Sequence, residues 1–417
     1  MKKVLYTLLA LCSFVSIQAQ DLIMFDWNNT PLPGNNISGL HAVGSGNTIW
    51  IATNQGTCRY NTNTGWTVNK LPQVGTLPNF LSSVVPDQNG QLYAGAFQNG
   101  VSTYNGTNWT NVAMGNIQDI HVDSLNQIWA ASSDAGLLFY DGNTWTNYRT
   151  SNTGGFNSDV VNYVTDDGKG LLYVGFDPQG NWAGGMASFD GTNWQRWTTQ
   201  INNLPDARIN HIAFKADGSM LLASDGGLLE GSGANWTAYT TSNSNIPSNT
   251  VNAVAVDENG LIWVGTESGF STFDGTTWTT FNTSNSDLAD NRIRDIVFDN
   301  TGHTWMATGN GVAVYKAGGA SVSIEEPLWA QRLGFQLTPN QLTADSELAY
   351  IIDLPQAAET QLSIFDMQGR IVARSDVQNR IPGIYEETME IEKLTAGLYF
   401  ARLQIEGFIR TEKFIVQ

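Results

Sequence analysis

The most regular hydrophobic pattern in this chain is a short step that recurs seven times: a large residue, an apolar residue, then Gly or Ala, with a further Gly close behind. Its first copy is Trp50-Ile51-Ala52 and its last is Trp305-Met306-Ala307. The large residues are Trp50, Tyr93, Trp129, Tyr173, Leu221, Trp263 and Trp305. Six intervals over 255 residues give a repeat of about 42, the length of a four-stranded propeller blade. The pattern therefore predicts a seven-bladed β-propeller.

Residues 251–281 show one complete unit. Four β-prone runs, at 251–256, 261–266, 270–273 and 277–281, are separated by turns such as Asn259-Gly260 and Asp274-Gly275. Both turns contain residues that tolerate the positive φ of a tight hairpin. The inner runs are almost continuously apolar, as expected where blades stack and cover both faces of a sheet. The Gly or Ala of the repeated step should let the next blade approach closely.

The seventh unit lacks a fourth strand of its own. Six units carry a Trp in that strand, at 66, 109, 145, 194, 236 and 278, but none follows Tyr315. The segment around Trp27 resembles Ala234-Asn235-Trp236, which begins the fourth strand of the fifth unit. We therefore predict that an N-terminal strand around Trp27 closes the last blade and removes the open seam of the ring.

The last 80 residues follow a different pattern. The blade motif stops near residue 321, and Glu325-Glu326-Pro327 reads as a linker. Six short β-prone runs follow, separated by turn signals, which favours a small Ig-like antiparallel β-sandwich. The predicted fold class is all-β, with domains at 20–317 (propeller), 318–334 (linker) and 335–417 (sandwich).

Residues 1–19 have the form of a secretory signal peptide. Lys2 and Lys3 precede an apolar run at 4–17, and Ala19 offers a small residue for cleavage. Leu11 is too bulky for the position before a lipidated cysteine, so Cys12 does not indicate a lipoprotein. No later segment contains the roughly 18 apolar residues that a spanning helix needs.

Composition narrows the classes of partner. The chain has 20 Lys and Arg against 38 Asp and Glu, a net charge of −18, which opposes binding to nucleic acid or anionic membranes. Charged residues make up only 14%, where about 25% is usual, so the surface must consist largely of neutral polar residues. Such a surface suits carbohydrate or protein contacts. Cys58, the one cysteine beyond the leader, can form no intrachain disulfide and should be a small buried thiol.

Two segments resemble known families. Residues 256–269 resemble the two-component-regulator propeller repeat, which occurs in the periplasmic sensor regions of hybrid histidine kinases and in secreted proteins. The last 80 residues resemble the C-terminal sorting domain of the type IX secretion system of Bacteroidota. Gln341 stands where that family often has a second Pro. The matching positions are Pro339, Asn340, Asp366, Gly369, Gly397, Tyr399 and Lys413.

The second resemblance implies export in two steps, through the inner membrane and then through the outer-membrane translocon. The implied partner is the type IX secretion machinery, acting on residues 335–417. The implied location is extracellular, with the protein secreted or held at the outer-membrane surface. A kinase role is not expected, since no membrane span or kinase follows the propeller. The alternative for residues 335–417 is an ordinary adhesive sandwich domain.

The sequence shows no catalytic, metal or cofactor motif. His41, His121, His211 and His303 lie in different units, and no paired cysteine, nucleophile elbow or phosphate loop occurs. A series of Asp residues recurs at the first turn of several units, where capping of the turn is the better explanation. We therefore expect no catalytic residue, no metal and no cofactor, although propellers can assemble a site from several blades around the channel.

A binding site can be placed more readily. The residue one step into each predicted inner strand is polar, and these residues should surround one mouth of the channel. The candidates for ligand binding are Gln118, Asn162, Asn210, Asn252 and Arg294, together with Trp182 in the expanded loop 176–185. An exposed indole among Asn and Gly is a platform for sugar rings. The alternatives are that the polar side chains bond one another, and that Trp182 folds back over blade four.

Two functions remain open at this level. The preferred one is a non-catalytic extracellular binding or scaffold protein that recognises a glycan or a protein through its loop-bearing face. The other is a secreted polysaccharide lyase or glycosidase with a site built in the channel by several blades. A tight cluster of carboxylates or histidines at the channel mouth would favour the enzyme.

Overall fold

The computed structural model describes residues 22–27, 29–30, 32–43, 46–62, 64–70, 80–106, 108–156, 158–179, 183–315, 333–338, 341–342, 347–354, 357–367, 370–391, 394–405 and 408–417. The predicted signal peptide lies outside this part of the chain, as does most of the predicted linker. The chain divides into two compact units, residues 1–27 with 32–321 and residues 28–31 with 322–417. The described residues are all strands and loops, with no helix that could cross a membrane.

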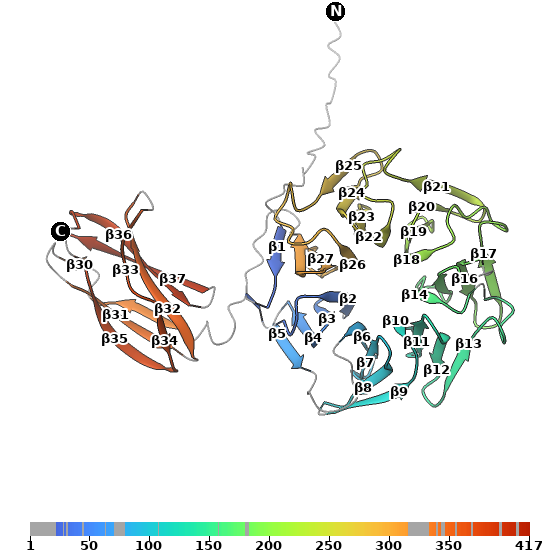
Figure 1. Ribbon diagram of the computed structural model, residues 1–417, viewed down its shortest axis with the longest axis horizontal. Helices are drawn as coiled ribbons and strands as arrows, with labels where there is room; N and C mark the ends of the chain where they lie inside the picture. Colours follow the sequence, from blue (N-terminus) through green and yellow to red (C-terminus); the bar gives the residue numbers. More distant parts are fainter. Residues whose placement is uncertain are drawn as a thin grey trace, which may run out of the picture. The chain divides into compact units, whose positions relative to one another are not determined.

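The first unit is a seven-bladed propeller. Its seven four-stranded antiparallel sheets surround a common centre, with the first strand of each blade innermost (Figure 1). Blades 1 to 3 consist of β2 (Ile37–Val43), β3 (Thr48–Thr53), β4 (Gly56–Asn61) and β5 (Gly65–Lys70); β6 (Leu81–Pro86), β7 (Leu92–Ala96), β8 (Gly100–Tyr104) and β9 (Trp109–Ala113); and β10 (Ile117–Val122), β11 (Ile128–Ser132), β12 (Gly136–Tyr140) and β13 (Trp145–Tyr148).

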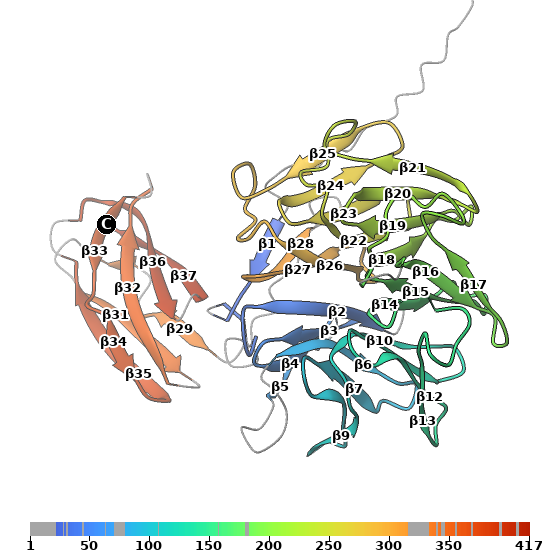
Figure 2. The ribbon, with the colours of Figure 1, turned by 45° about the vertical axis from the view of Figure 1, so that its right-hand side comes forward.

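The remaining blades follow in chain order around the ring, which Figure 2 shows turned by 45°. Blades 4 to 6 consist of β14 (Val161–Asp166), β15 (Leu172–Phe176), β16 (Gly185–Phe189) and β17 (Trp194–Trp197); β18 (Ile209–Phe214), β19 (Met220–Ser224), β20 (Gly227–Ser232) and β21 (Asn235–Tyr239); and β22 (Val251–Val256), β23 (Ile262–Thr266), β24 (Gly269–Phe273) and β25 (Trp278–Phe281). Blade 7 consists of β26 (Ile293–Phe298), β27 (Thr304–Thr308), β28 (Gly311–Tyr315) and, from the start of the chain, β1 (Leu22–Phe25).

The ring is closed by β1, which pairs antiparallel with β28. Leu22 lies opposite Tyr315, so it occupies the position that Trp109 holds opposite Tyr104 in blade 2. Trp27 lies two residues beyond the strand and is 57% exposed. The sequence alignment that put Trp27 in this position was therefore wrong in register, because an edge strand of four residues can meet its partner wherever its apolar residues fit.

Phe25 supplies the aromatic contact at this seam. It is 2% exposed, and its ring centroid lies 5.4 Å from Trp66 of blade 1 and 5.7 Å from Trp305 of blade 7. Tyr60 of blade 1 completes the cluster at 4.9 Å from Trp305. Blades 7 and 1 are thus joined by a packed aromatic cluster as well as by the strand.

The first turns of several blades are fixed by local side-chain chemistry. The Asp257 Oδ1 atom accepts the backbone N–H groups of Asn259 and Leu261, both at 2.9 Å. Asp87 and Asp123 cap their turns in the same way. The interpretation of this Asp series as turn caps is confirmed at these positions.

Blade packing explains the small residue of the repeated step. A Cβ atom on Gly265 would lie 2.6 Å from Cγ2 of Ile293 in the next blade, and one on Gly95 would lie 2.5 Å from Cγ2 of Ile117. Both distances are too short for real atoms, so only Gly permits this spacing. Cys58 on β4 is fully buried, and burial raises the pKa of its thiol.

The second unit is a β-sandwich of two sheets. One sheet contains β29 (Gly334–Leu337), β31 (Glu347–Leu354) and β35 (Gly383–Glu390). The other contains β30 (Gln341–Leu342), β37 (Phe408–Val416), β36 (Gly397–Ile405), β32 (Ala358–Phe365), β33 (Ile371–Arg374) and β34 (Gln378–Arg380). One apolar core lies between them and includes Leu348 and Ile352 from the first sheet and Leu362 and Leu403 from the second.

Several of the predicted sorting-motif residues hold turns or pack in this core. The Asp366 carboxylate accepts the backbone N–H of Arg370 at 2.9 Å and forms an ion pair with its guanidinium at 2.7 Å. The Tyr399 hydroxyl donates to the Thr395 carbonyl at 2.9 Å, and the ring packs on Phe414. Gly397 begins β36, and Lys413 is exposed on β37. Pro339, Asn340 and Gly369 lie outside the described residues.

Candidate functional site

The innermost strands all begin at one face of the propeller, and we call it the loop face. It carries the loops between the second and third strands of each blade and the loops that connect one blade to the next. Three of the connecting loops contain the tripeptide Thr-Ser-Asn, ending at Asn152, Asn243 and Asn285. In each, the Asn Oδ1 accepts a backbone N–H three residues back at 2.7 Å. Its Nδ2 donates to a carbonyl five residues back at 2.9–3.0 Å, which closes the loop.

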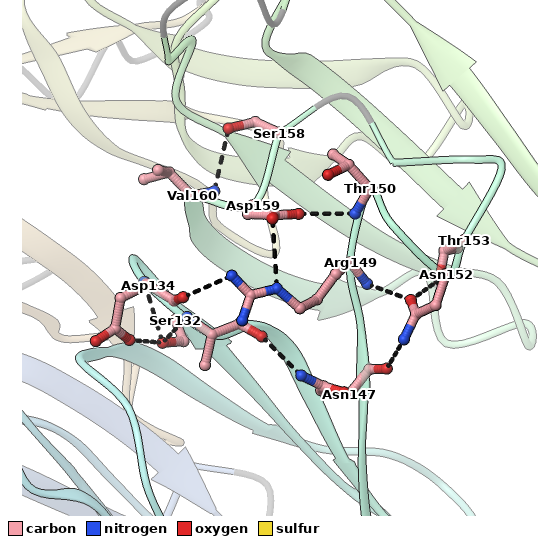
Figure 3. A network of polar contacts seen from close by, with 11 residues as sticks. Ser132, Asp134, Asn147, Arg149, Thr150, Asn152, Thr153, Ser158, Asp159 and Val160 are labelled. Carbon is pink, nitrogen blue, oxygen red and sulfur yellow. Dashed lines mark hydrogen bonds and ion pairs between the residues drawn. The ribbon is translucent and has the colours of Figure 1, made fainter.

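The loop between blades 3 and 4 shows how these loops are fixed to the blades (Figure 3). Arg149 donates through Nε to Asp159 at 3.3 Å and through Nη2 to the backbone carbonyl of Asp134 at 3.0 Å. The other Asp159 oxygen accepts the backbone N–H of Thr150 at 2.7 Å. The loop face therefore presents a backbone held by many short hydrogen bonds.

Charged and amide side chains form an array on the loop face over blades 4 and 5. Arg208, which is 45% exposed, bridges Asp177 at 3.2 Å and Asp225 at 3.5 Å. Asn210 donates to the same Asp225 at 3.1 Å. Burial raises the pKa of Asp177, while the neighbouring Arg208 acts in the opposite direction. The array combines donors and acceptors in fixed positions beside solvent.

A second array of the same kind lies over blade 6. Glu267 accepts from Asn252 at 2.9 Å and forms an ion pair with Arg292 at 3.0 Å. Arg292 is 52% exposed. In both arrays the loop between the second and third strands supplies a carboxylate, and the innermost strand of the same blade supplies an amide. The guanidinium comes from the residue just before an innermost strand.

The ring of polar residues predicted at the channel mouth joins neighbouring blades. Five of these residues, each one step into an innermost strand, donate to the first carbonyl of the next innermost strand. Asn210 donates to Val251 at 2.9 Å, and Asn252 donates to Ile293 at 3.0 Å. Arg294 of blade 7 donates to the carbonyl of Ile37 in blade 1 at 2.7 Å. Ser38 and Asn162 make the corresponding bonds to Leu81 and Ile209.

Two of the residues predicted to bind a ligand are not among those that form these bonds between blades in the described part of the chain. Gln118 bonds within its own blade, to Asn116 and Ser133. Trp182 lies outside the described residues. A role of the predicted residues in ligand binding stays a prediction, with Asn210 and Asn252 also belonging to the two surface arrays.

A second cluster lines the channel itself, and the sequence reasoning missed it. Every innermost strand has a register shift after its first residue, so its second residue has no partner in the neighbouring strand and regular pairing resumes at the third. Four of these third residues meet, namely Asp119, Tyr163, His211 and Asp295. The Tyr163 and His211 rings stack at 4.1 Å, and Nε2 of His211 lies 3.8 Å from Oδ1 of Asp295. Since blades 5 and 7 are not neighbours, this contact spans the channel.

Burial shifts the titration of these channel groups. It raises the pKa of Asp119 to about 7, with the Asp295 charge adding to the effect, and that of Asp295 to about 6. It lowers the pKa of His211 to about 3. The pKa of His41, further along the channel, falls to about 4 through burial and the nearby His121. Shifts of this kind are common in active sites and also in structural networks.

The two channel carboxylates have structural partners. Asp119 accepts the backbone N–H of Val164 in the next blade at 3.4 Å, and Asp295 accepts that of Leu40 at 2.7 Å. Innermost strands are edge strands, so some of their backbone N–H groups have no partner strand. These carboxylates accept hydrogen bonds from two such N–H groups, which would otherwise need water as a partner. Within the described residues no group of three or more His, Cys, Asp or Glu is arranged to hold a metal ion.

Family comparisons agree with both halves of this architecture. Residues 346–417 match the family described as secretion system C-terminal sorting domain, and residues 245–268 match two component regulator propeller. The chain thus carries a secretion system C-terminal sorting domain, and a segment of its β-propeller matches the two component regulator propeller. The sorting domain implies the type IX secretion machinery as a partner and places this propeller protein at the cell surface or in the extracellular space.

Solved structures show the same fold. The propeller protein is similar to the extracellular domain of BT3049 from B. thetaiotaomicron, assigned to a hybrid two component system, with a TM-score of 0.61, 16% identity and coverage of 95% of this chain and 57% of that one. The extracellular domain of BT4673 from the same organism gives a TM-score of 0.55 at 14% identity, with coverage of 96% and 58%. The chain thus spans less than two thirds of either domain.

A third similar structure is virginiamycin B lyase from Staphylococcus aureus, with a TM-score of 0.55, 11% identity and coverage of 71% of this chain and 99% of the lyase. At such identities these likenesses establish the propeller fold alone. No curated protein matches the sequence.

Proposed function

We propose that this exported propeller protein is a non-catalytic binding protein whose loop face recognises a glycan. The observation that carries the proposal is the pair of arrays in which Arg208 and Arg292 lie beside carboxylates and amides on that face. Sugar hydroxyl groups are both donors and acceptors. Planar carboxylate, amide and guanidinium groups can form hydrogen bonds with these hydroxyl groups, and the ligand itself needs no charge.

Rigidity of the face supports the same proposal. The Thr-Ser-Asn loops and the Arg149 network fix the backbone before any ligand arrives. A pre-ordered surface loses little conformational entropy on binding, which favours recognition of a flexible polysaccharide. A Trp182 platform in the expanded loop 176–185 would add stacking area to the array at Asp177 and Arg208.

The test is a binding screen of the purified protein against host and plant polysaccharides, followed by two matched variants. Arg208→Ala removes the centre of one array, and we expect at least tenfold weaker binding with an unchanged melting curve. Arg196→Ala removes an exposed Arg from the outer strand β17 and should leave affinity unchanged. Binding that survives Arg208→Ala, Arg292→Ala and Trp182→Ala would refute the site, and no binding to any glycan would point to a protein partner.

The channel cluster favours one second candidate, a polysaccharide-active enzyme. Asp119 and His211 offer groups whose pKa values are moved apart, an arrangement used for acid–base chemistry. The same screen should record new reducing or unsaturated ends. Product that appears with the native protein and disappears with His211→Ala would replace the binding role with catalysis.

A further inference from the structure

A cavity of about 360 Å³ opens between blades 3 and 4 on the face opposite the loop face. Its walls include Trp129 and Phe139 of blade 3, Tyr148 on the outer strand of that blade, and Phe189 of blade 4. The first turns of both blades border it, at Leu125 and Gly170. Nothing in the proposed function uses this cavity.

The four aromatic rings form a continuous wall. Centroids of Trp129 and Phe139 are 4.2 Å apart, and those of Trp129 and Tyr148 are 6.0 Å apart. Phe189 lies 6.2 Å from Trp129 and 5.9 Å from Tyr148. Aromatic faces carry negative electrostatic potential, so a pocket walled by several rings favours a positively charged guest over a neutral one.

Two carboxylates border the same cavity. Asp123 is fixed by the backbone N–H of Gln127 and by Nε1 of Trp129, both at 2.9 Å. Asp166 forms a hydrogen bond of 2.9 Å with Nε2 of His121, which holds the pKa of Asp166 below its usual value and keeps it ionised. No Lys or Arg lines the cavity among the residues described.

The protein contains an equivalent cavity in which a cation is already present. Between blades 1 and 2, Trp50 corresponds to Trp129, and Arg59 corresponds to Phe139, since each lies opposite the Trp in the strand register. The Arg59 guanidinium lies over the Trp50 ring, 5.8 Å from its centroid. The chain thus places its own cation on the Trp50 ring. In the cavity between blades 3 and 4 the Phe139 ring takes that place against Trp129, and the lining residues that the structure describes include carboxylates but no Lys or Arg.

We propose that the cavity between blades 3 and 4 binds an organic ammonium group, with Trp129, Phe139, Tyr148 and Phe189 as the aromatic wall and Asp123 and Asp166 as counter-charges. The group belongs to a small molecule such as choline or to an alkylated lysine side chain, which share this chemistry. Desolvated contacts between cations and aromatic faces give such sites their selectivity for charge over shape. The net charge of −18 raises the local concentration of any cationic ligand.

The test compares choline with its neutral isostere 3,3-dimethylbutan-1-ol by calorimetry on the full exported chain. We expect choline to bind at least tenfold more tightly than the alcohol. Phe139→Arg supplies an internal cation, as blade 1 does with Arg59, and should weaken choline binding at least tenfold. Thr103→Arg, which makes the same change opposite Tyr93 in blade 2, should leave choline binding unchanged.

Asp166→Asn provides a second variant that leaves the aromatic wall intact, and it should weaken choline binding severalfold. Equal binding of choline and the alcohol, or equal losses in Phe139→Arg and Thr103→Arg, would overturn the proposal. So would a failure of choline to bind at millimolar concentration. A peptide with one trimethyllysine separates the two sources, because tighter binding of the peptide than of choline indicates an ammonium carried by a protein.

Discussion

Replacing Phe25 with alanine should open the seam between blades 7 and 1. Phe25 is almost fully buried and packs on Trp66 and Trp305, so its loss removes a large apolar side chain and two aromatic contacts. Such truncations cost about 3–5 kcal/mol. For a domain of this size the cost corresponds to a fall in melting temperature of roughly 5–8 °C.

The assay is urea unfolding followed by far-UV circular dichroism, on protein produced without residues 1–19. Trp27→Ala is the matched control, because Trp27 lies just beyond the same strand and is 57% exposed. It should cost less than about 1 kcal/mol. Equal losses in the two variants, or a loss below about 1 kcal/mol for Phe25→Ala, would refute the assignment of β1 and Phe25 as the closure.

A second readout follows the opening of blade 1 directly. Cys58 on β4 is fully buried, and β4 pairs with the strand that carries Trp66. A thiol reagent should therefore label Cys58 only when blade 1 opens. We expect labelling at least tenfold faster in Phe25→Ala than in the native protein or in Trp27→Ala. An unchanged rate would mean that the seam is not the point at which the ring opens.

Three further predictions address the channel, the blade spacing and the export signal. Burial raises the pKa of Asp119 from 3.8 to about 7, so the folded protein binds this proton more tightly than the unfolded chain does. The resulting contribution to the free energy of unfolding is fully present below pH 3.8 and is lost as the pH rises through about 7. The stability of Asp119→Asn relative to the native protein should accordingly improve between pH 4 and pH 8, by up to about 4 kcal/mol, in chemical denaturation at each pH; a constant difference would contradict it. Gly265→Ala should cost about 1–3 kcal/mol because its Cβ would meet Ile293, whereas Gly154→Ala, which has open space, should be nearly neutral; equal melting temperatures would argue against tight blade spacing. A periplasmic reporter fused to residues 335–417 should reach the surface of a type IX-competent host, and retention in the periplasm would contradict the sorting function.

The blades were predictable because their signals are local. A repeat of about 42 residues, the Asp that caps the first turn of several blades, and the small residue at the blade contact each act within a few residues or between one blade and the next. The sorting module was predictable for a similar reason, since short motifs such as the one around Asp366 hold individual turns.

The closing strand shows where this local reasoning ends. It pairs Leu22 with Tyr315, two residues that most of the propeller sequence separates, and no residue near either in the sequence fixes the register. The sequence indicated that a strand from the N-terminal segment was needed, but it could not choose between Trp27 and Leu22 as the residue that packs. The Thr-Ser-Asn tripeptide that recurs in three connecting loops is a further local signal in the sequence.

The sequence by itself determined the number of blades, the turn chemistry, the export module and the polar residue near the start of each inner strand. Only the tertiary structure decided what those polar residues contact, because their partners are carbonyl groups of the next blade. It also brought Asp119, His211 and Asp295 together in the channel. Those residues come from blades 3, 5 and 7, and a contact among them exists only when the ring has closed, since closure sets distances that no spacing along the chain encodes.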